Sequence, residues 1–187
     1  MTWVSALLAV VCLAVGVLHL TRLVVRRDDV LGEASHAAMG FGMAAMFSPA
    51  VHPVPVLAWV VVFVLCGAWF AAAAVRTRSW TGDAAHHVVG SGAMLLMLAA
   101  GHGAGHEGGR GLVSVVAILL AGYFAWHLLR CVDRLGTPAG TAASPPPARG
   151  VGPVGAALLD RAPGPRLVGV AHVVTAATMT IMLLGAL

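Results

Sequence analysis

Three histidines in the sequence are each followed by two methionines at the same spacing, seven and ten residues further along the chain. Methionine accounts for only eight of the 187 residues, and six of the eight fill these positions, so chance is a poor explanation. Thioether sulfur is a soft ligand that suits Cu(I), and imidazole suits copper, zinc and iron. The three sets are His36, Met43 and Met46; His87, Met94 and Met97; and His172, Met179 and Met182.

Helix geometry indicates what this spacing can do. Seven residues make about two turns, so each histidine and its first methionine lie on one face about 10 Å apart. If the three helices face a common axis, the side chains form one imidazole layer and two thioether layers. Layers of this kind would offer a soft monovalent ion successive weak sites, which is what permeation needs. We therefore expect the protein to bind or transport a metal ion, with copper as the cofactor or cargo.

The elements that position these residues are predicted to be transmembrane helices. Of all residues, 59% are hydrophobic and 10% are charged, and the mean hydropathy is +0.92, which excludes an ordinary soluble domain. The length suffices for six spans of about 20 residues in the lipid bilayer. The net charge of +4 requires no nucleic-acid partner. The predicted spans are residues 3–25, 31–50, 56–75, 84–100, 112–131 and 167–187. The second is rich in small residues, so a hydropathy window alone would miss it.

Arginine predicts the orientation of the six spans. All eleven basic residues are arginine, and ten of them follow the first, third or fifth span. By the positive-inside rule these connections are cytoplasmic, and both chain termini lie outside a multi-pass protein of the cell membrane. The imidazole layer would then lie toward the cytoplasm and the thioethers further out. Residues 133–166, rich in Pro, Gly and Ala, are predicted to be a flexible cytoplasmic linker.

The predicted fold is all-α, with three repeated helical hairpins. The second helix of each hairpin carries one His/Met set, and the first helices repeat more weakly. The first and fifth spans both end in a histidine followed three residues later by arginine, at His19 and His127. These two are additional candidate ligands, with an interfacial polar cap as the competing interpretation. His52, His102 and His106, with Glu107, are candidate entry ligands in outer loops.

Acidic residues stand three positions before two of the histidines. Glu33 precedes His36, and Asp83 precedes His86, at the predicted cytoplasmic starts of two helices. Under this alignment His86 replaces His87 as the repeated histidine, although only His87 fits the methionine spacing, so both remain candidates. Met39 is the one methionine after the initiator that lies outside the pattern, and it is a further candidate ligand.

Other functions remain open. Histidines with Glu33 or Asp83 as a base could form an intramembrane zinc hydrolase, although the pattern favours a protein that is not an enzyme. Two of the five span histidines could ligate haem b. The methionines could also be duplicated core packing in a structural membrane subunit.

The three cysteines, Cys12, Cys66 and Cys131, are predicted to be small buried apolar residues. Protein partners cannot be inferred.

Two resemblances accompany these patterns. The methionine layers above an imidazole layer resemble the pore of high-affinity copper transporters, although that family's M-x-x-x-M signature is missing. The whole chain resembles a family of small His/Met-rich polytopic membrane proteins from actinobacteria that is known as a domain of unknown function. That resemblance rests on His36 and Met39 with the two methionines that follow, and on the His86-His87 pair before Met94 and Met97. It implies a membrane location and no particular activity.

Overall fold

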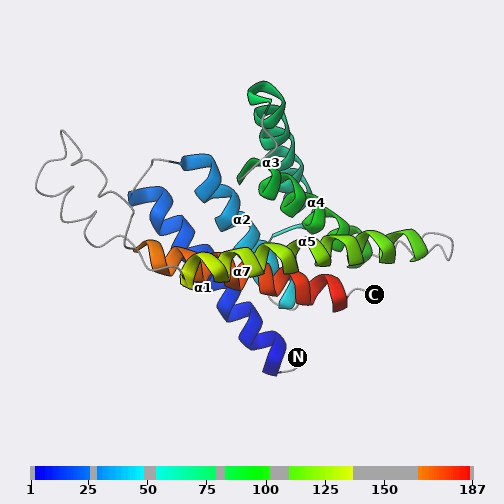
Figure 1. The fold of residues 1–187 in the computed structure, drawn as a ribbon. Helices are drawn as coiled ribbons and strands as arrows, with labels where there is room; N and C mark the ends of the chain where they lie inside the picture. Colours follow the sequence, from blue (N-terminus) through cyan, green and yellow to red (C-terminus); the bar gives the residue numbers. More distant parts are fainter. Residues whose placement is uncertain are drawn as a thin grey trace, which may run out of the picture.

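The computed structural model describes residues 3–25, 29–48, 54–78, 83–101, 110–136 and 164–185. These residues form six α-helices and no strands (Figure 1). Each helix coincides with one of the six predicted spans, so the all-α prediction is confirmed. The helices are α1 (Trp3–Val25), α2 (Val30–Phe47), α3 (Val56–Thr77), α4 (Asp83–Gly101), α5 (Arg110–Gly136) and α7 (Pro165–Gly185).

The helices have the length and surface of a membrane protein. Four of them, α1, α3, α5 and α7, are long and apolar enough to cross a bilayer, and Ala84–Ala100 of α4 is a shorter apolar helix. Large apolar side chains point outward: Leu57 is 71% exposed and Leu119 is 68% exposed. Exposed apolar surface on this scale suits lipid rather than water. The 18 residues of α2 would extend about 27 Å, close to the thickness of the hydrocarbon core. The chain is therefore a polytopic membrane protein.

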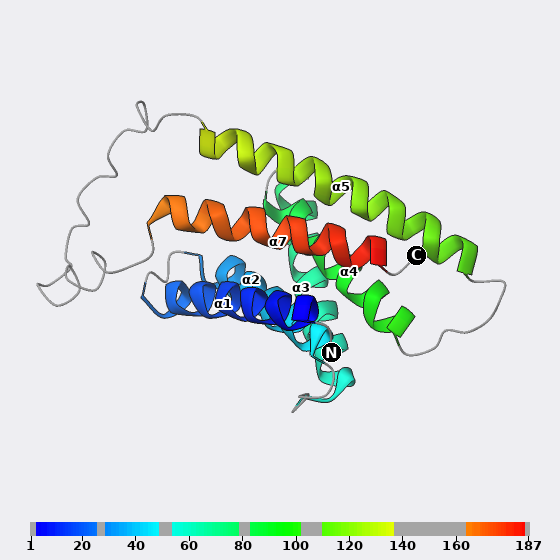
Figure 2. The same cartoon turned by 90° about the horizontal axis from the view of Figure 1, so that it is seen from below.

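The helices pack as three hairpins. The most extensive contacts are those of α1 with α2, α3 with α4, and α5 with α7 (Figure 2). Between hairpins, the second helix of each contacts the first helix of the next, in the order α2 to α3, α4 to α5 and α7 to α1. In addition α2 contacts α4. Three hairpins around one axis would give this cyclic order.

The start of α1 and the end of α7 lie at the same end of the bundle (Figure 2). An even number of crossings requires this, and it agrees with the prediction that both termini lie on one side of the membrane. Which side that is remains a prediction from the arginine distribution.

Most helix ends differ from the predicted spans by a few residues, and two of these differences affect the predicted linker. Helix α5 continues to Gly136, and α7 begins at Pro165, so the predicted linker of residues 133–166 is helical at both ends. The added turn of α5 carries Asp133 and Arg134, which are exposed, so it extends the helix beyond its apolar part. Proline suits the first position of α7 because that position needs no backbone N–H donor. The remainder of the linker, residues 137–163, lies outside the described residues.

The first hairpin is held together by a close backbone approach. A Cβ atom at Gly40 of α2 would lie 2.7 Å from the backbone nitrogen of Gly16 in α1 and 3.0 Å from the carbonyl oxygen of Cys12. Only glycine fits at such a distance, and small residues at helix interfaces are typical of membrane bundles. The start of α2 is fixed by Asp29, whose carboxylate accepts a hydrogen bond from the backbone N–H of Gly32 at 3.0 Å.

We predict that substitution by alanine has different effects on stability at two glycines of neighbouring hairpins. Gly40→Ala should lower stability by about 1–3 kcal/mol because the new methyl group meets backbone that cannot move aside. Gly92→Ala is the matched control, since a Cβ atom there has nothing within 4 Å. It should be neutral, or stabilising by up to about 1 kcal/mol through helix propensity. Thermal unfolding of the purified variants in detergent measures both, and equal melting temperatures would contradict the packing of α1 on α2.

Candidate metal centre

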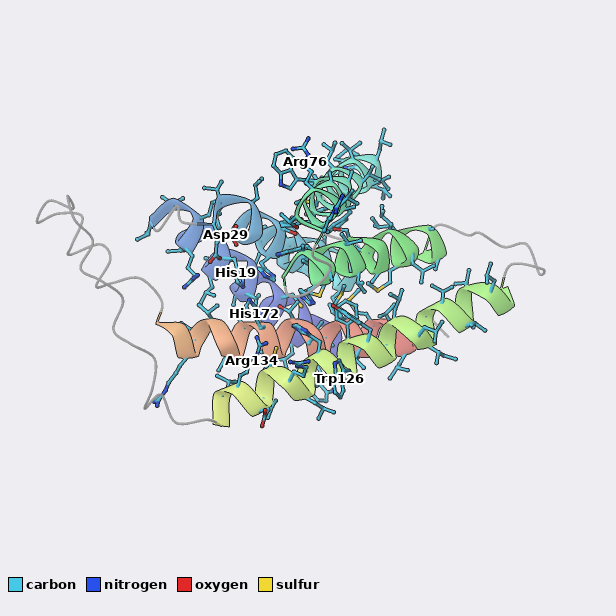
Figure 3. The ribbon with its side chains drawn as sticks, turned by 45° about the horizontal axis from the view of Figure 1, so that its top comes forward. His19, Asp29, Arg76, Trp126, Arg134 and His172 are labelled. Carbon is cyan, nitrogen blue, oxygen red and sulfur yellow. The ribbon has the colours of Figure 1, made fainter. Side chains whose placement is uncertain are left out.

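Six histidines from five helices form one continuous cluster inside the bundle. His36 of α2 is its centre, because its ring lies 4.7 Å from the rings of His19 and His172 and 4.6 Å from that of His87. His86 lies 5.9 Å from His36 and stacks on His127 at 4.1 Å. Figure 3 shows His19 and His172 between α1 and α7. Each hairpin thus contributes two histidines to the cluster.

Three of these side chains have the spacing of a metal site. His19, His36 and His172 each offer a ring nitrogen, and the three nitrogens lie within 4.8 Å of one another. Three imidazole nitrogens bound to one ion at about 2 Å would lie about 3.4 Å apart, so shifts of about 1 Å by each ring would suffice. The three residues come from α1, α2 and α7, so the site joins the first hairpin to the third.

A carboxylate orients the first of these imidazoles. Oε2 of Glu33, in the first turn of α2, lies 2.7 Å from Nδ1 of His19, and Arg22 Nε donates to Oε1 of the same carboxylate at 2.6 Å. Because an ionised carboxylate only accepts hydrogen bonds, Nδ1 of His19 carries the proton. Nε2 of His19 is then the atom with a free lone pair. Metal-binding histidines are commonly oriented by a carboxylate in this way.

Several ring nitrogens in the cluster are buried without hydrogen bonds. Nε2 of His19 and Nδ1 of both His36 and His86 have no hydrogen-bond partner among the described residues. His19 is 1% exposed and His86 is 7% exposed. A buried polar atom without a partner costs about 1–3 kcal/mol. The cluster therefore carries a desolvation cost that a bound ion would offset.

The two adjacent histidines of α4 face different neighbours. His87 stacks on Phe70 of α3 at 4.1 Å and lies next to His36, whereas His86 faces His127 and Tyr123 of α5. A helix turns about 100° per residue, so adjacent side chains point into different interfaces. The sequence pattern treated His86 and His87 as alternatives, but both belong to the cluster.

The patterned methionines lie in the bundle core, seven and ten residues further along their helices than the three repeated histidines. Met43, Met94 and Met179 are fully buried, and Met97 is 8% exposed. They share one core cluster with Met39, Phe63, Leu98 and Leu183, while Met46 and Met182 pack against its edge. Sulfur atoms gather between α4 and α7 in Figure 3. The methionines are therefore interspersed with apolar side chains, so this core can serve packing as well as coordination.

Methionines of α2 and α4 pack reciprocally over glycines. A Cβ atom at Gly42 of α2 would lie 2.7 Å from Cε of Met94, and one at Gly90 of α4 would lie 2.9 Å from Sδ of Met39. Each thioether thus occupies the space that a glycine leaves on the opposite helix. Met39, which lies outside the repeated spacing, is as deeply buried as Met43 and Met94.

The structure adds partners that the spacing did not reveal. The sequence left His19 and His127 undecided between ligands and polar caps, and both lie in the cluster. The contact of Glu33 with Arg22 was not predicted. The two residues lie near the end of α1 and the start of α2, which form one hairpin. The side chain of Asp83 and the residues His52, His102, His106 and Glu107 lie outside the described part of the chain.

All three cysteines are free thiols. Cys12 and Cys131 are buried and Cys66 is partly buried, in agreement with the predicted role as small buried residues. The thiol of Cys12 lies near the side chain of Thr178 in α7, and that of Cys66 near Ser35 in α2, so both cysteines lie where helices of different hairpins meet.

Residues 28–186 match a family whose description is "Domain of unknown function (DUF5134)". The chain belongs to this family. The match begins after α1 and covers α2 to α7, so it includes five of the six histidines of the cluster and all the patterned methionines. No curated protein and no solved structure matches the chain. Membership in DUF5134 therefore leaves the chemistry of the cluster to be argued from its geometry.

We predict that Arg22 and Glu33 are energetically coupled. Their side chains are 15% and 13% exposed, so Glu33→Gln removes the negative charge that pairs with the guanidinium of Arg22 at a largely buried position and should cost about 1–3 kcal/mol. The double variant Arg22→Gln/Glu33→Gln should lose less stability than the two single variants added together. Thermal unfolding of the four proteins forms a double-mutant cycle, and strictly additive losses would contradict the ion pair.

Proposed function

We propose that the protein binds Cu(I) in the membrane through the histidine cluster, with His19, His36 and His172 as the ligands. One observation carries the proposal: ring nitrogens from three helices lie within 4.8 Å of one another, beside a carboxylate that orients one of the rings. The buried nitrogens without hydrogen bonds support a bound ion at this place, because packing alone would not offset the free-energy cost of burying them.

Charge favours a monovalent ion over a divalent one. The carboxylate of Glu33 is already balanced by the guanidinium of Arg22, and the three imidazoles are neutral ligands. The free-energy cost of burying an ion rises with the square of its charge, so Cu(I) costs about a quarter as much as Zn²⁺. Burial of a divalent ion among neutral ligands in a membrane is correspondingly unfavourable.

The neighbouring thioethers favour copper for a second reason. Met39, Met43, Met94 and Met179 are fully buried in the core, three to seven residues along the same helices from His36, His87 and His172, and soft thioether ligands suit Cu(I). By the predicted orientation they lie between the imidazoles and the outer face. We propose that they offer weak successive sites, by which the ion reaches or leaves the imidazoles.

The two alternative cofactors fit the geometry less well. A zinc hydrolase needs a free carboxylate as base, whereas Glu33 is held by His19 and Arg22 at 2.7 and 2.6 Å. The side chain of Asp83, the other candidate base, lies outside the described residues. A haem needs a flat slot for the porphyrin between its two axial imidazoles. Here the rings of His19, His36, His87 and His172 pack directly on one another at 4.6 to 5.7 Å, which favours a single ion.

The test is the metal content and visible spectrum of the full chain purified after growth with copper, zinc and iron supplied. We predict copper as the bound metal and a colourless Cu(I) state without a haem band. The variant His36→Gln/His172→Gln should lose the ion, because it removes two of the three ligands. The control Leu98→Met/Leu183→Met changes two residues of the same core without removing a ligand and should retain it.

Three outcomes would contradict the proposal. Zinc in place of copper would favour the hydrolase, and an absorption band of haem would favour a cytochrome-like role. Equal copper content in the wild type and the double-histidine variant would place the ion elsewhere. Elution volume in size-exclusion chromatography checks that each variant is folded.

A further inference from the structure

The histidine cluster extends beyond the three proposed copper ligands. His86 of α4 and His127 of α5 stack with their ring centroids 4.1 Å apart and their planes 17° apart. This pair lies where the second hairpin meets the third, whereas His19, His36 and His172 join the first hairpin to the third. The cluster therefore has two parts, each made between different hairpins.

The pair has the features of a ligand site. His86 is 7% exposed, and its Nδ1 atom is buried without a hydrogen-bond partner among the described residues. The ring of Tyr123 flanks both imidazoles, at 6.4 Å from His86 and 6.3 Å from His127. Two neutral imidazoles from facing helices are a donor set that Cu(I), a soft ion satisfied by few ligands, can accept.

His36 connects the two parts of the cluster. Its ring lies 4.7 Å from those of His19 and His172, and 5.9 Å from that of His86. An ion held at His36 therefore needs to move only a few ångströms to bind His86. Such a step is a ligand exchange, in which a bond from copper to a first-site nitrogen breaks as a bond to His86 forms. The ion remains Cu(I), and no proton or electron is transferred.

We infer that His86 and His127 form a second Cu(I) position, which exchanges its ion with the first position through His36. The inference rests on the proposed function. Because the lone pair of an imidazole lies in the ring plane, the two rings turn from their stacked orientation to bind one ion. His127, like His36 and His172, is partly buried. The two ions repel each other, so the second binds more weakly than the first and is the one released.

The experiment is a titration of the metal-free, full-length protein in detergent with Cu(I), in competition with a chromophoric Cu(I) chelator and without oxygen. The wild type should bind two ions per chain, and His127→Phe should bind one. Phenylalanine retains the aromatic contact with His86 while removing the nitrogen ligand. His127→Gln retains a polar side chain instead and should also bind one, so the result does not depend on one variant folding. Tyr123→Phe is the matched control from the same helix face and should bind two.

Each other result overturns a separate claim. One ion in the wild type and in every variant overturns the second position and leaves the proposed function intact. Two ions in the wild type and in both His127 variants overturn the assignment of His127 as a ligand. No ion in the wild type overturns the proposed function itself.

Discussion

Imidazole rings buried in a membrane bundle have a free-energy cost, because neither lipid nor apolar side chains can replace their hydrogen bonds to water. The rest of the site depends on how that cost is met. The proton of His19 Nδ1 is satisfied by Glu33, whose charge is balanced by Arg22. His36 and His86 retain buried nitrogens without partners among the described residues. The bundle therefore stabilises some ring nitrogens and leaves others as available ligands.

Positioning of the rings depends on the close approach of α1 to α2. Gly16 and Gly40 let the two backbones come together, and this brings the first turn of α2 against the last turns of α1. Glu33 thereby reaches both His19 and Arg22 across the hairpin. The same hairpin then meets α7, which adds His172 to the group. A packing contact one to two turns away thus determines the geometry of the site.

Much of the fold can be predicted from the sequence because its signals are strong and local. The apolar runs give the helices α1, α3, α5 and α7, which are the four that satisfy length and hydropathy together. The mean hydropathy of α2 is lower because of its glycines and its polar residues Glu33, Ser35 and His36. Its His/Met pattern is the signal that it shares with α4 and α7. The end of α5 was missed because Asp133 and Arg134 break the apolar run without breaking the helix.

The candidate site could be predicted only in part. Spacing along a helix identifies the shared faces of His36, His87 and His172, and these three histidines do lie in one cluster. Spacing gives no information on contacts between hairpins, which is why the Glu33 contact with His19 and the stacking of His86 on His127 were not foreseen. It also does not separate methionines that pack from methionines that bind, since both lie in the core.

The most direct test of the account is X-ray absorption at the copper edge on the purified chain loaded with one Cu(I) ion. We predict a first shell of nitrogen atoms at about 2 Å, with the outer-shell scattering that imidazole rings produce. A first shell of sulfur atoms at about 2.3 Å without imidazole scattering would place the ion among the methionines or cysteines. That result would contradict the assignment of the histidine cluster as the copper site.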